Sequence, residues 1–248
     1  MVEKEEKKLI KNKKINFILG PGKIFEVANI INETLNKKKK KIQDNLYINK
    51  INKIAINKTK NEEVFIKINK GCNNNCSYCV VPKVRGKEIN KSPYEIINEI
   101  KKLEKKEIKK ITLIGQTVNN YFYKSFGKIY DFSDLLYEID KQTNDTIKIK
   151  FLTNYPKKID RNIIKLLKNS DKFIKLIHMP AQSGSNKILK LMKRNYLIEE
   201  YIEFLEEIKT EIKEISIISD FIIGFPGESK EDYLKTLEII KKIKFKKL

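Results

Sequence analysis

The residues best suited to chemistry in this chain are three cysteines in one short segment. Gly71 is followed by Cys72, Cys76 and Cys79, a CxxxCxxC pattern. Thiolates are the preferred ligands of iron in iron–sulfur clusters, and a compact loop can place three of them around one face of a cubane. Three protein ligands leave the fourth iron open to a small molecule. The spacing therefore predicts a 4Fe-4S cluster with one open coordination position.

Two other interpretations of the cysteines remain open. Zinc normally takes four ligands, and the single histidine, His178, lies far along the chain, so a Cys3His zinc site is conceivable. The three cysteines could also be buried structural residues. Because they fall within eight residues and are odd in number, they do not suit a disulfide framework. They are what a metal site in a reducing compartment would need.

Short apolar runs alternate with amphipathic stretches after Glu63, and these elements must position the cysteines. Strand–helix alternation at this spacing predicts right-handed crossovers and a parallel sheet. The expected fold class is α/β, an open, incomplete (β/α) barrel, with a sixth strand due at the final KIKFKKL. We expect strands at 64–69, 111–115, 147–153, 173–179 and 215–223, and helices at 93–106, 133–141, 160–169, 185–192, 198–210 and 230–243.

The first part of the chain predicts a different organisation. Residues 16–20 read as a strand and 24–36 as a helix, which is too little for a domain. The segment 1–41 therefore resembles the remnant of an N-terminal domain. A lysine run and a polar stretch make 42–63 a linker, and 64–248 forms the core.

The net charge of +21, from 53 Lys+Arg against 32 Asp+Glu, suits a polyanion such as RNA. The argument is weakened by composition, because Arg85, Arg161 and Arg194 are the only arginines, and a bias toward Lys, Asn and Ile also follows from an AT-rich coding sequence. An arginine kept in such a chain marks a site that needs a planar, bidentate donor. No apolar run is long enough for a membrane span or a signal peptide, so the sequence predicts a cytoplasmic protein.

The segments flanking the cysteines are similar to the radical S-adenosylmethionine (SAM) methylthiotransferases in order and spacing. The resemblance covers residues 15–245 through GCNNNCSYCVVPKVRGKE, ITLIGQTVNNY, FLTNYP, HMPAQSGSNKILKLMKRNY and ISDFIIGFPGES. Val80 to Pro82 and Arg85 to Glu88 resemble the branch that modifies N6-isopentenyladenosine beside the tRNA anticodon (the MiaB type). The alternatives are the threonylcarbamoyladenosine branch, the ribosomal-protein branch and a truncated, non-catalytic RNA-binding remnant.

The resemblance implies a role in binding SAM for residues at the strand ends. Tyr78 would lie against the adenine, Gly115 and Gln116 beside the amino group, and Arg194 on the carboxylate. The family follows Thr153 with Ser-His-Pro where this chain has Asn154-Tyr155-Pro156, which leaves the role of Thr153 in doubt. His178 is expected to be a structural histidine, and no catalytic acid, base or nucleophile is assigned. The remaining candidates are Gln182 and Ser183, which follow the fourth strand, and Asp220, near the end of the fifth strand.

The resemblance also implies parts that this chain does not contain. The family binds an auxiliary 4Fe-4S cluster through three cysteines of an N-terminal domain, and no cysteine precedes Cys72. The RNA-binding β-barrel of the family is missing as well. The implied partners are a tRNA anticodon stem-loop, a reducing protein such as flavodoxin or ferredoxin, and a second polypeptide that carries the missing half. The source of the inserted sulfur stays open, as does the choice between a fragment, a split enzyme and a degraded one.

Overall fold

The computed structural model describes residues 63–125, 127–156 and 160–248 and, before them, 9, 11–12, 14–15, 17–20, 26–37 and 41–43. The chain forms two compact units. One contains residues 1–52, 70–75 and 79–89, and the other contains 53–69, 76–78 and 90–248. The linker expected at 42–63 lies almost wholly outside the described residues, so the proposed domain boundaries stay a prediction.

The first unit contains a small parallel pair of strands and a helix. Strand β1 (Phe17–Leu19) pairs with β2 (Lys41–Gln43), and α2 (Val27–Lys37) follows β1 in the chain. The strand and the helix expected in 16–36 are therefore present. Helix α3 (Val81–Arg85), which we did not predict, has a proline in its first turn and ends at Gly86, whose φ of 75° suits glycine.

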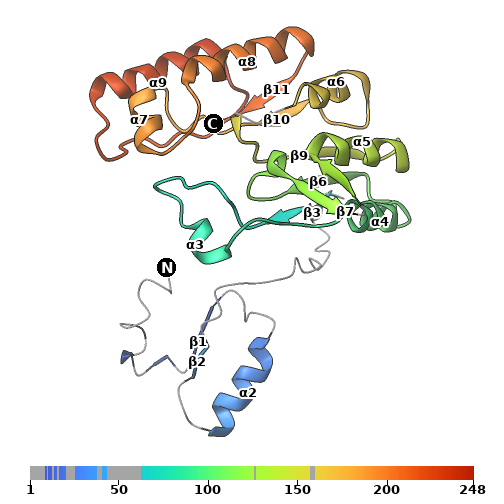
Figure 1. The fold of residues 1–248 in the computed structure, drawn as a ribbon, viewed down its shortest axis with the longest axis vertical. Helices are drawn as coiled ribbons and strands as arrows, with labels where there is room; N and C mark the ends of the chain where they lie inside the picture. The colour runs from blue at the N-terminus through green and yellow to red at the C-terminus, as the bar shows by residue number, and fades with distance from the viewer. Residues whose placement is uncertain are drawn as a thin grey trace. The chain divides into compact units, whose positions relative to one another are not determined.

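Parallel strands form the centre of the second unit (Figure 1). Strands β3 (Glu63–Lys67), β6 (Lys110–Ile114) and β9 (Lys148–Phe151) make one sheet in that order. Strands β10 (Leu176–His178) and β11 (Ser216–Ile218) make another, and a parallel bridge from Ile149 to Phe173 joins the two. The strand order therefore follows the chain order, as expected for an open, incomplete barrel.

A sixth position in the sheet is occupied where the sequence predicted it. Lys247 forms a parallel bridge with Ile218, and the amide of Lys246 donates to the carbonyl of Ile217 at 2.8 Å. Four of the five predicted strands are shorter in the structure than in the sequence analysis, and the strand predicted at 111–115 keeps its length as β6 but begins one residue earlier. Their ends turn outward to form the loops that carry the candidate site.

The predicted helices are present, and all of them except α7 pack in series along the chain. Helix α4 contacts α5, α5 contacts α6, α6 contacts α8, and α8 contacts α9 (Figure 1). Ser92 caps α4, Asp131 caps α5, and Ser229 caps α9 through capping boxes. Their bounds are α4 (Pro93–Glu104), α5 (Phe132–Gln142), α6 (Arg161–Asn169), α7 (Asn186–Leu191), α8 (Ile198–Glu211) and α9 (Lys230–Ile243).

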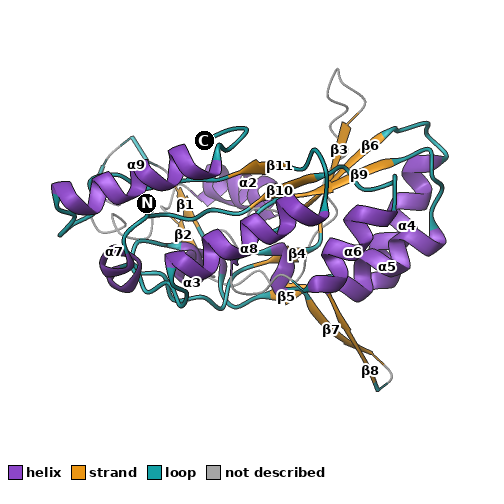
Figure 2. Ribbon diagram, turned by 90° about the horizontal axis from the view of Figure 1, so that it is seen from above, coloured by secondary structure: helices purple, strands orange, loops and turns teal. Residues whose placement is uncertain are grey.

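Five further short elements were not predicted. A single turn of 3-10 helix, η2 (Val118–Asn120), leads into an antiparallel hairpin of β7 (Phe122–Ser125) and β8 (Lys128–Asp131). The hairpin projects away from the helices in Figure 2. Strands β4 (Asn69–Lys70) and β5 (Ile89–Asn90) are only two residues long and pair with each other. Elements of this length show no period that a sequence could reveal.

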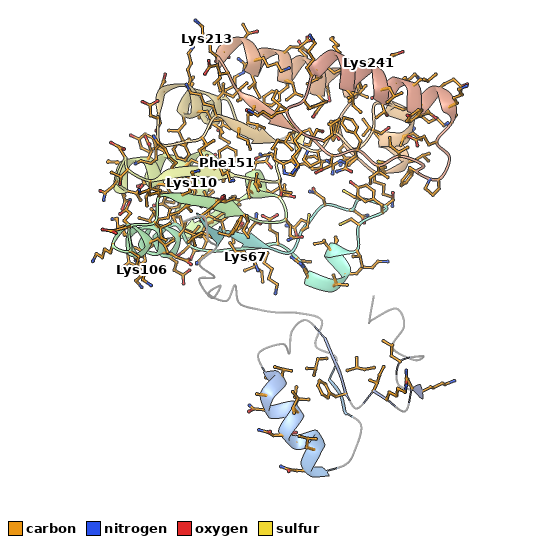
Figure 3. The ribbon with its side chains drawn as sticks, turned by 180° about the vertical axis from the view of Figure 1, so that it is seen from behind. Lys67, Lys106, Lys110, Phe151, Lys213 and Lys241 are labelled. Carbon is orange, nitrogen blue, oxygen red and sulfur yellow. The ribbon has the colours of Figure 1, made fainter. Side chains whose placement is uncertain are left out.

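Apolar side chains fill the space between the sheet and its helices. Phe151 and Phe132 pack edge to face with ring centroids 5.1 Å apart. Figure 3 shows Lys106 and Lys213 pointing outward, away from this core. Among the described residues, no helix is long and apolar enough to cross a membrane.

Candidate functional site

The cysteine loop begins with a glycine that the local packing requires. Gly71 has φ of 74°, and a Cβ at this position would lie 2.1 Å from the carbonyl oxygen of Lys87. The amide of Cys72 donates to the carbonyl of Gly86 at 3.2 Å, and the side chain of Asn73 accepts from the amide of Glu88 at 3.1 Å. The segment 86–88 therefore fixes the start of the cysteine loop.

The middle of the cysteine loop is anchored to the end of α7. The hydroxyl of Ser77 donates to the carbonyl of Leu191 at 2.8 Å, and the amide of Ser77 donates to the carbonyl of Met192 at 3.1 Å. Neither bond was apparent from the sequence, because the two segments are 114 residues apart. They bring Cys76 and Tyr78 beside the segment that carries Arg194.

Arg194 contacts the cysteine loop directly. Its Nη1 lies 3.5 Å from Sγ of Cys76, and its Nη2 donates to the carbonyl of Pro180 at 3.4 Å. The guanidinium carbon lies 4.3 Å from the ring centre of Tyr155 and 5.3 Å from that of Tyr196. Burial alone would lower the pKa of Arg194, but Tyr196, Tyr78 and Cys76 hold it above its ordinary value. The side chain is therefore a fixed cation beside a candidate metal ligand.

Tyr78 lies at the surface between the second and third cysteines. It is 38% exposed. The ring meets that of Phe225 edge to face, with centroids 6.5 Å apart. Phe225 belongs to the segment ISDFIIGFPGES, so the structure brings together two of the segments that carry the family resemblance.

The turn after β6 is held by a buried side chain that we did not single out. Asn69 accepts from the amide of Gln116 at 3.0 Å and donates to the carbonyl of Thr117 at 2.7 Å. Gly115 is needed here, because a Cβ would lie 1.9 Å from Oδ1 of Asn69. One amide side chain thus fixes the backbone that presents Gly115 and Gln116, both candidates for binding SAM.

Asparagine side chains also bond to the backbone of a neighbouring loop after β6 and after β9. Asn119 donates to the carbonyl of Tyr155 at 2.8 Å and accepts from its amide at 2.7 Å. Asn154 donates to the carbonyl of His178 through its side chain at 3.0 Å and through its backbone amide at 2.9 Å. We call Asn69, Asn119 and Asn154 the asparagine clamps. All three side chains are buried, and each joins one strand-end loop to a neighbouring one.

His178 joins Thr153 to Asp220 across three strand ends. Its Nδ1 accepts from the amide of Thr153 at 3.3 Å, and its Nε2 lies 2.8 Å from Oδ2 of Asp220. Thr153 has φ of 71°, a left-handed conformation that costs a threonine free energy unless its surroundings hold it. Both ring nitrogens are engaged, as expected of a structural histidine, and Asp220 remains exposed.

The loop after β10 carries Gln182 and Ser183, and it packs against α9. Gln182 has φ of 70°, while its backbone pairs with Asp220 and Ile222 in the bridge that extends β10 and β11. Ser183 is fully buried, and its hydroxyl accepts from the amide of Ser185 at 3.2 Å. The structure thus leaves the side chain of Gln182 at the site but turns that of Ser183 into the protein.

A carboxylate of the protein lies at the start of α7. Asp232, from the first turn of α9, accepts from the hydroxyl of Ser185 at 2.6 Å and pairs with Lys187 at 2.8 Å, both at the start of α7. The hydrogen bonds from Lys187, Ser185 and Ser229 hold the pKa of Asp232 well below its ordinary value. The negative charge at this position therefore comes from the protein itself.

The donor chemistry of the cysteine loop fits an iron–sulfur cluster. All three cysteines are free thiols and are partly exposed. Cys72 accepts from the amide of Asn74 at 3.4 Å, and Cys76 accepts from Arg194, which are the kinds of bond that sulfur ligands of clusters receive. Within the described residues, no three His, Cys, Asp or Glu side chains are grouped closely enough to hold a metal ion. The ligand assignment therefore stays a prediction from spacing and donor type.

A family model described as "Radical SAM superfamily" matches residues 66–240. The chain belongs to this superfamily. The match begins within β3 and ends within α9, so it contains most of the parallel sheet.

The chain is also similar in sequence to individual curated proteins. The chain is 43% identical over 250 residues to a tRNA-2-methylthio-N(6)-dimethylallyladenosine synthase of Buchnera aphidicola subsp. Cinara cedri, covering 97% of this chain and 57% of the relative. It is 40% identical over 234 residues to the Pelagibacter ubique protein of the same name, covering 93% of this chain and 52% of the relative. The chain thus spans little more than half the length of the relatives that it matches.

Solved structures agree with the fold. The radical S-adenosylmethionine methyltransferase TsrM from Kitasatospora setae, solved with cobalamin and a 4Fe-4S cluster, gives a TM-score of 0.60 at 16% identity. The match covers 73% of this chain and 34% of TsrM. At this identity the likeness concerns the fold alone, and it supports the open barrel predicted from the strand–helix alternation.

Proposed function

We propose that this chain is the radical SAM core of a tRNA-2-methylthio-N6-dimethylallyladenosine synthase, which methylthiolates C2 of N6-isopentenyladenosine beside the anticodon. The observation that carries the proposal is 43% identity to a synthase of that name over 97% of the chain, cysteine loop included. The substrate would be a tRNA anticodon stem-loop, and the positive charge of the chain suits phosphate contacts.

In this proposal Cys72, Cys76 and Cys79 hold a 4Fe-4S cluster. When bound, the cluster supplies an open iron for the amino and carboxylate groups of SAM and the electron that splits its sulfonium. Gln116, presented by the Asn69 clamp, offers its carboxamide to the amino group, and the exposed ring of Tyr78 covers the adenine.

The loops after β10 and β11 complete the proposed SAM site. Asp220 is exposed and is held by His178, so its free carboxylate oxygen can accept from a ribose hydroxyl. Gln182 extends from the paired segment beside it. Thr153 and Ser183 serve through their backbones, because Thr153 is locked in a left-handed conformation and the side chain of Ser183 is buried.

The proposed function makes a specific prediction for the isolated chain. We expect reductive cleavage of SAM to 5'-deoxyadenosine but no methylthiolated product, because the three further cysteines that the resemblance implies for sulfur delivery do not occur in this sequence. A second polypeptide would provide them, and a flavodoxin or ferredoxin would provide the electron.

The test is anaerobic reconstitution with iron and sulfide, followed by dithionite, SAM and an anticodon stem-loop that bears isopentenyladenosine. Cys79→Ser is the inactive control, since it keeps the fold but removes one ligand. Zinc in the purified protein, or iron whose spectrum does not respond to SAM, would rule the proposal out. Methylthiolated RNA from the isolated chain would refute the expectation about sulfur delivery alone.

A further inference from the structure

Arg194 has its guanidinium held on three sides. Tyr155 lies under it at 4.3 Å, Tyr196 lies beside it at 5.3 Å, and the carbonyl of Pro180 accepts from Nη2. These contacts leave Nη1 directed at Sγ of Cys76, 3.5 Å away. The Nε atom is buried and has no hydrogen-bond partner in the described part of the chain.

Tyr155 is itself fixed from two directions. Asn119 holds its backbone through both the amide and the carbonyl, and its phenol oxygen accepts from the amide of Asn195 at 3.1 Å. Its ring also meets that of Tyr196 edge to face, with centroids 5.9 Å apart. A continuous set of contacts therefore runs from the turn after β6 through Tyr155 and Arg194 to the cysteine loop.

A lysine could not make these contacts in the same way. A guanidinium is planar, so it can stack on a ring while it donates in its own plane to a sulfur and a carbonyl. An ammonium is a point charge on a flexible stem and has no such face. This requirement explains why an arginine stands here in a chain with only two others.

We propose that Arg194 raises the reduction potential of the cluster through its hydrogen bond to Cys76, and that Tyr155 is the positioning residue that keeps the guanidinium in place. The inference rests on the proposed function, because it assumes that Cys76 is a cluster ligand. Reduction adds negative charge to the cluster and its sulfurs, so a fixed cation and an N–H donor stabilise the reduced form more than the oxidised form.

The experiment is a spectroelectrochemical titration of the full chain after anaerobic reconstitution, with iron counted per chain. Arg194→Met removes the donor and the charge, and Tyr155→Leu removes the ring beneath the guanidinium. Tyr155→Phe keeps the ring, and Tyr94→Leu, at a position 76% exposed on α4, is the matched control. Each variant is compared with the wild type at one applied potential near the wild-type midpoint.

We expect the ratio of reduced to oxidised cluster to fall about tenfold in Arg194→Met, a shift of about 59 mV for one electron. Tyr155→Leu should move in the same direction by less, while Tyr155→Phe and Tyr94→Leu should match the wild type. A merely structural role for Arg194 would reduce iron content without moving the potential of the cluster that remains.

The outcomes separate this inference from the proposed function. A wild-type chain that binds no cluster refutes the proposed function itself. A loaded wild type with an unchanged potential in Arg194→Met overturns the inference alone. If Arg194→Met holds no iron, Tyr155→Leu decides the matter, because it keeps all three cysteines and the arginine; a wild-type potential there counts against the inference.

Discussion

His178 Nε2 lies 2.8 Å from Oδ2 of Asp220, and this contact joins the end of β10 to the end of β11. Because Nδ1 accepts from the amide of Thr153, the proton of the neutral ring must reside on Nε2 and is donated to the carboxylate. One imidazole thus fixes a left-handed threonine on one side and orients an exposed carboxylate on the other.

The tautomer of His178 can be measured directly. The chain has one histidine, so its ring nitrogens give a single set of signals in a long-range 1H–15N spectrum. At pH 8 we expect a protonated Nε2 and an unprotonated Nδ1. Asp220→Asn should leave this tautomer unchanged, because the amide of Thr153 sets it. A protonated Nδ1 in the wild type would show that the bond from Thr153 does not exist.

Asn69→Asp tests the first asparagine clamp. The substitution is almost isosteric, but it replaces the donor to Thr117 by an oxygen and places a carboxylate in a fully buried position. We expect the free energy of unfolding to fall by about 2–4 kcal/mol, from the lost bond and the unpaired buried group. Urea denaturation measures the change. Asn144→Asp, exposed in the loop before β9, is the control and should change stability by less than about 0.5 kcal/mol.

Gly184→Ala tests the packing of the loop after β10 against α9. A Cβ here would lie 2.6 Å from Cα of Thr236 and 2.7 Å from the backbone of Lys235. Since a helix backbone cannot move aside cheaply, we expect a loss of about 1–3 kcal/mol in thermal or urea unfolding. Gly127→Ala provides the contrast, because nothing lies within 4 Å and only its φ of +78° opposes the change. Equal costs at both positions would argue against a clash at Gly184.

The low pKa of Asp232 predicts how stability depends on pH. Lys187, Ser185 and Ser229 hold the pKa below its ordinary value, so folding favours the charged carboxylate. This contribution is present above the pKa of an unfolded aspartate, about 3.9, and is lost as the pH falls below that value. Asp232→Asn should therefore be less stable than the wild type at pH 6, and the gap in free energy of unfolding should narrow by pH 3. A gap that stays constant would mean that the charge of Asp232 makes no contribution.

The sequence predicted the elements with strong periodicity and missed those fixed by single contacts. Helices α4 and α9 begin at the residues that Ser92 and Ser229 mark, and five short apolar runs gave the five parallel strands. The cysteine spacing and the strand-end glycines pointed to the site. Asn69 and Asn119 gave no signal, because asparagine is common in this chain and only a fold can show which amides are buried against a backbone.

Side-chain roles were the hardest part to predict. Ser183 looked like a site residue, yet its hydroxyl bonds within its own loop. Tyr155 looked like a departure from the family pattern, yet it carries the ring on which Arg194 rests. The role of Tyr155 depends on contacts over long separations in the chain, such as the 36 residues between Asn119 and Tyr155 and the 118 residues between Arg194 and Cys76. Periodicity and spacing report only on near neighbours.

The contacts between α9 and the loop after β10 have a consequence for synthesis on the ribosome. Ser185 and Gly184 find their partners Asp232 and Thr236 only 47 and 52 residues later. Until that stretch emerges from the exit tunnel, the hydroxyl of Ser185 and the amide of Gly184 lack these hydrogen-bond partners, and the nascent loop has no α9 to pack against. The loop after β10 therefore completes these contacts only after α9 has been translated, and a ribosome stalled before α9 would expose an immature, protease-sensitive loop.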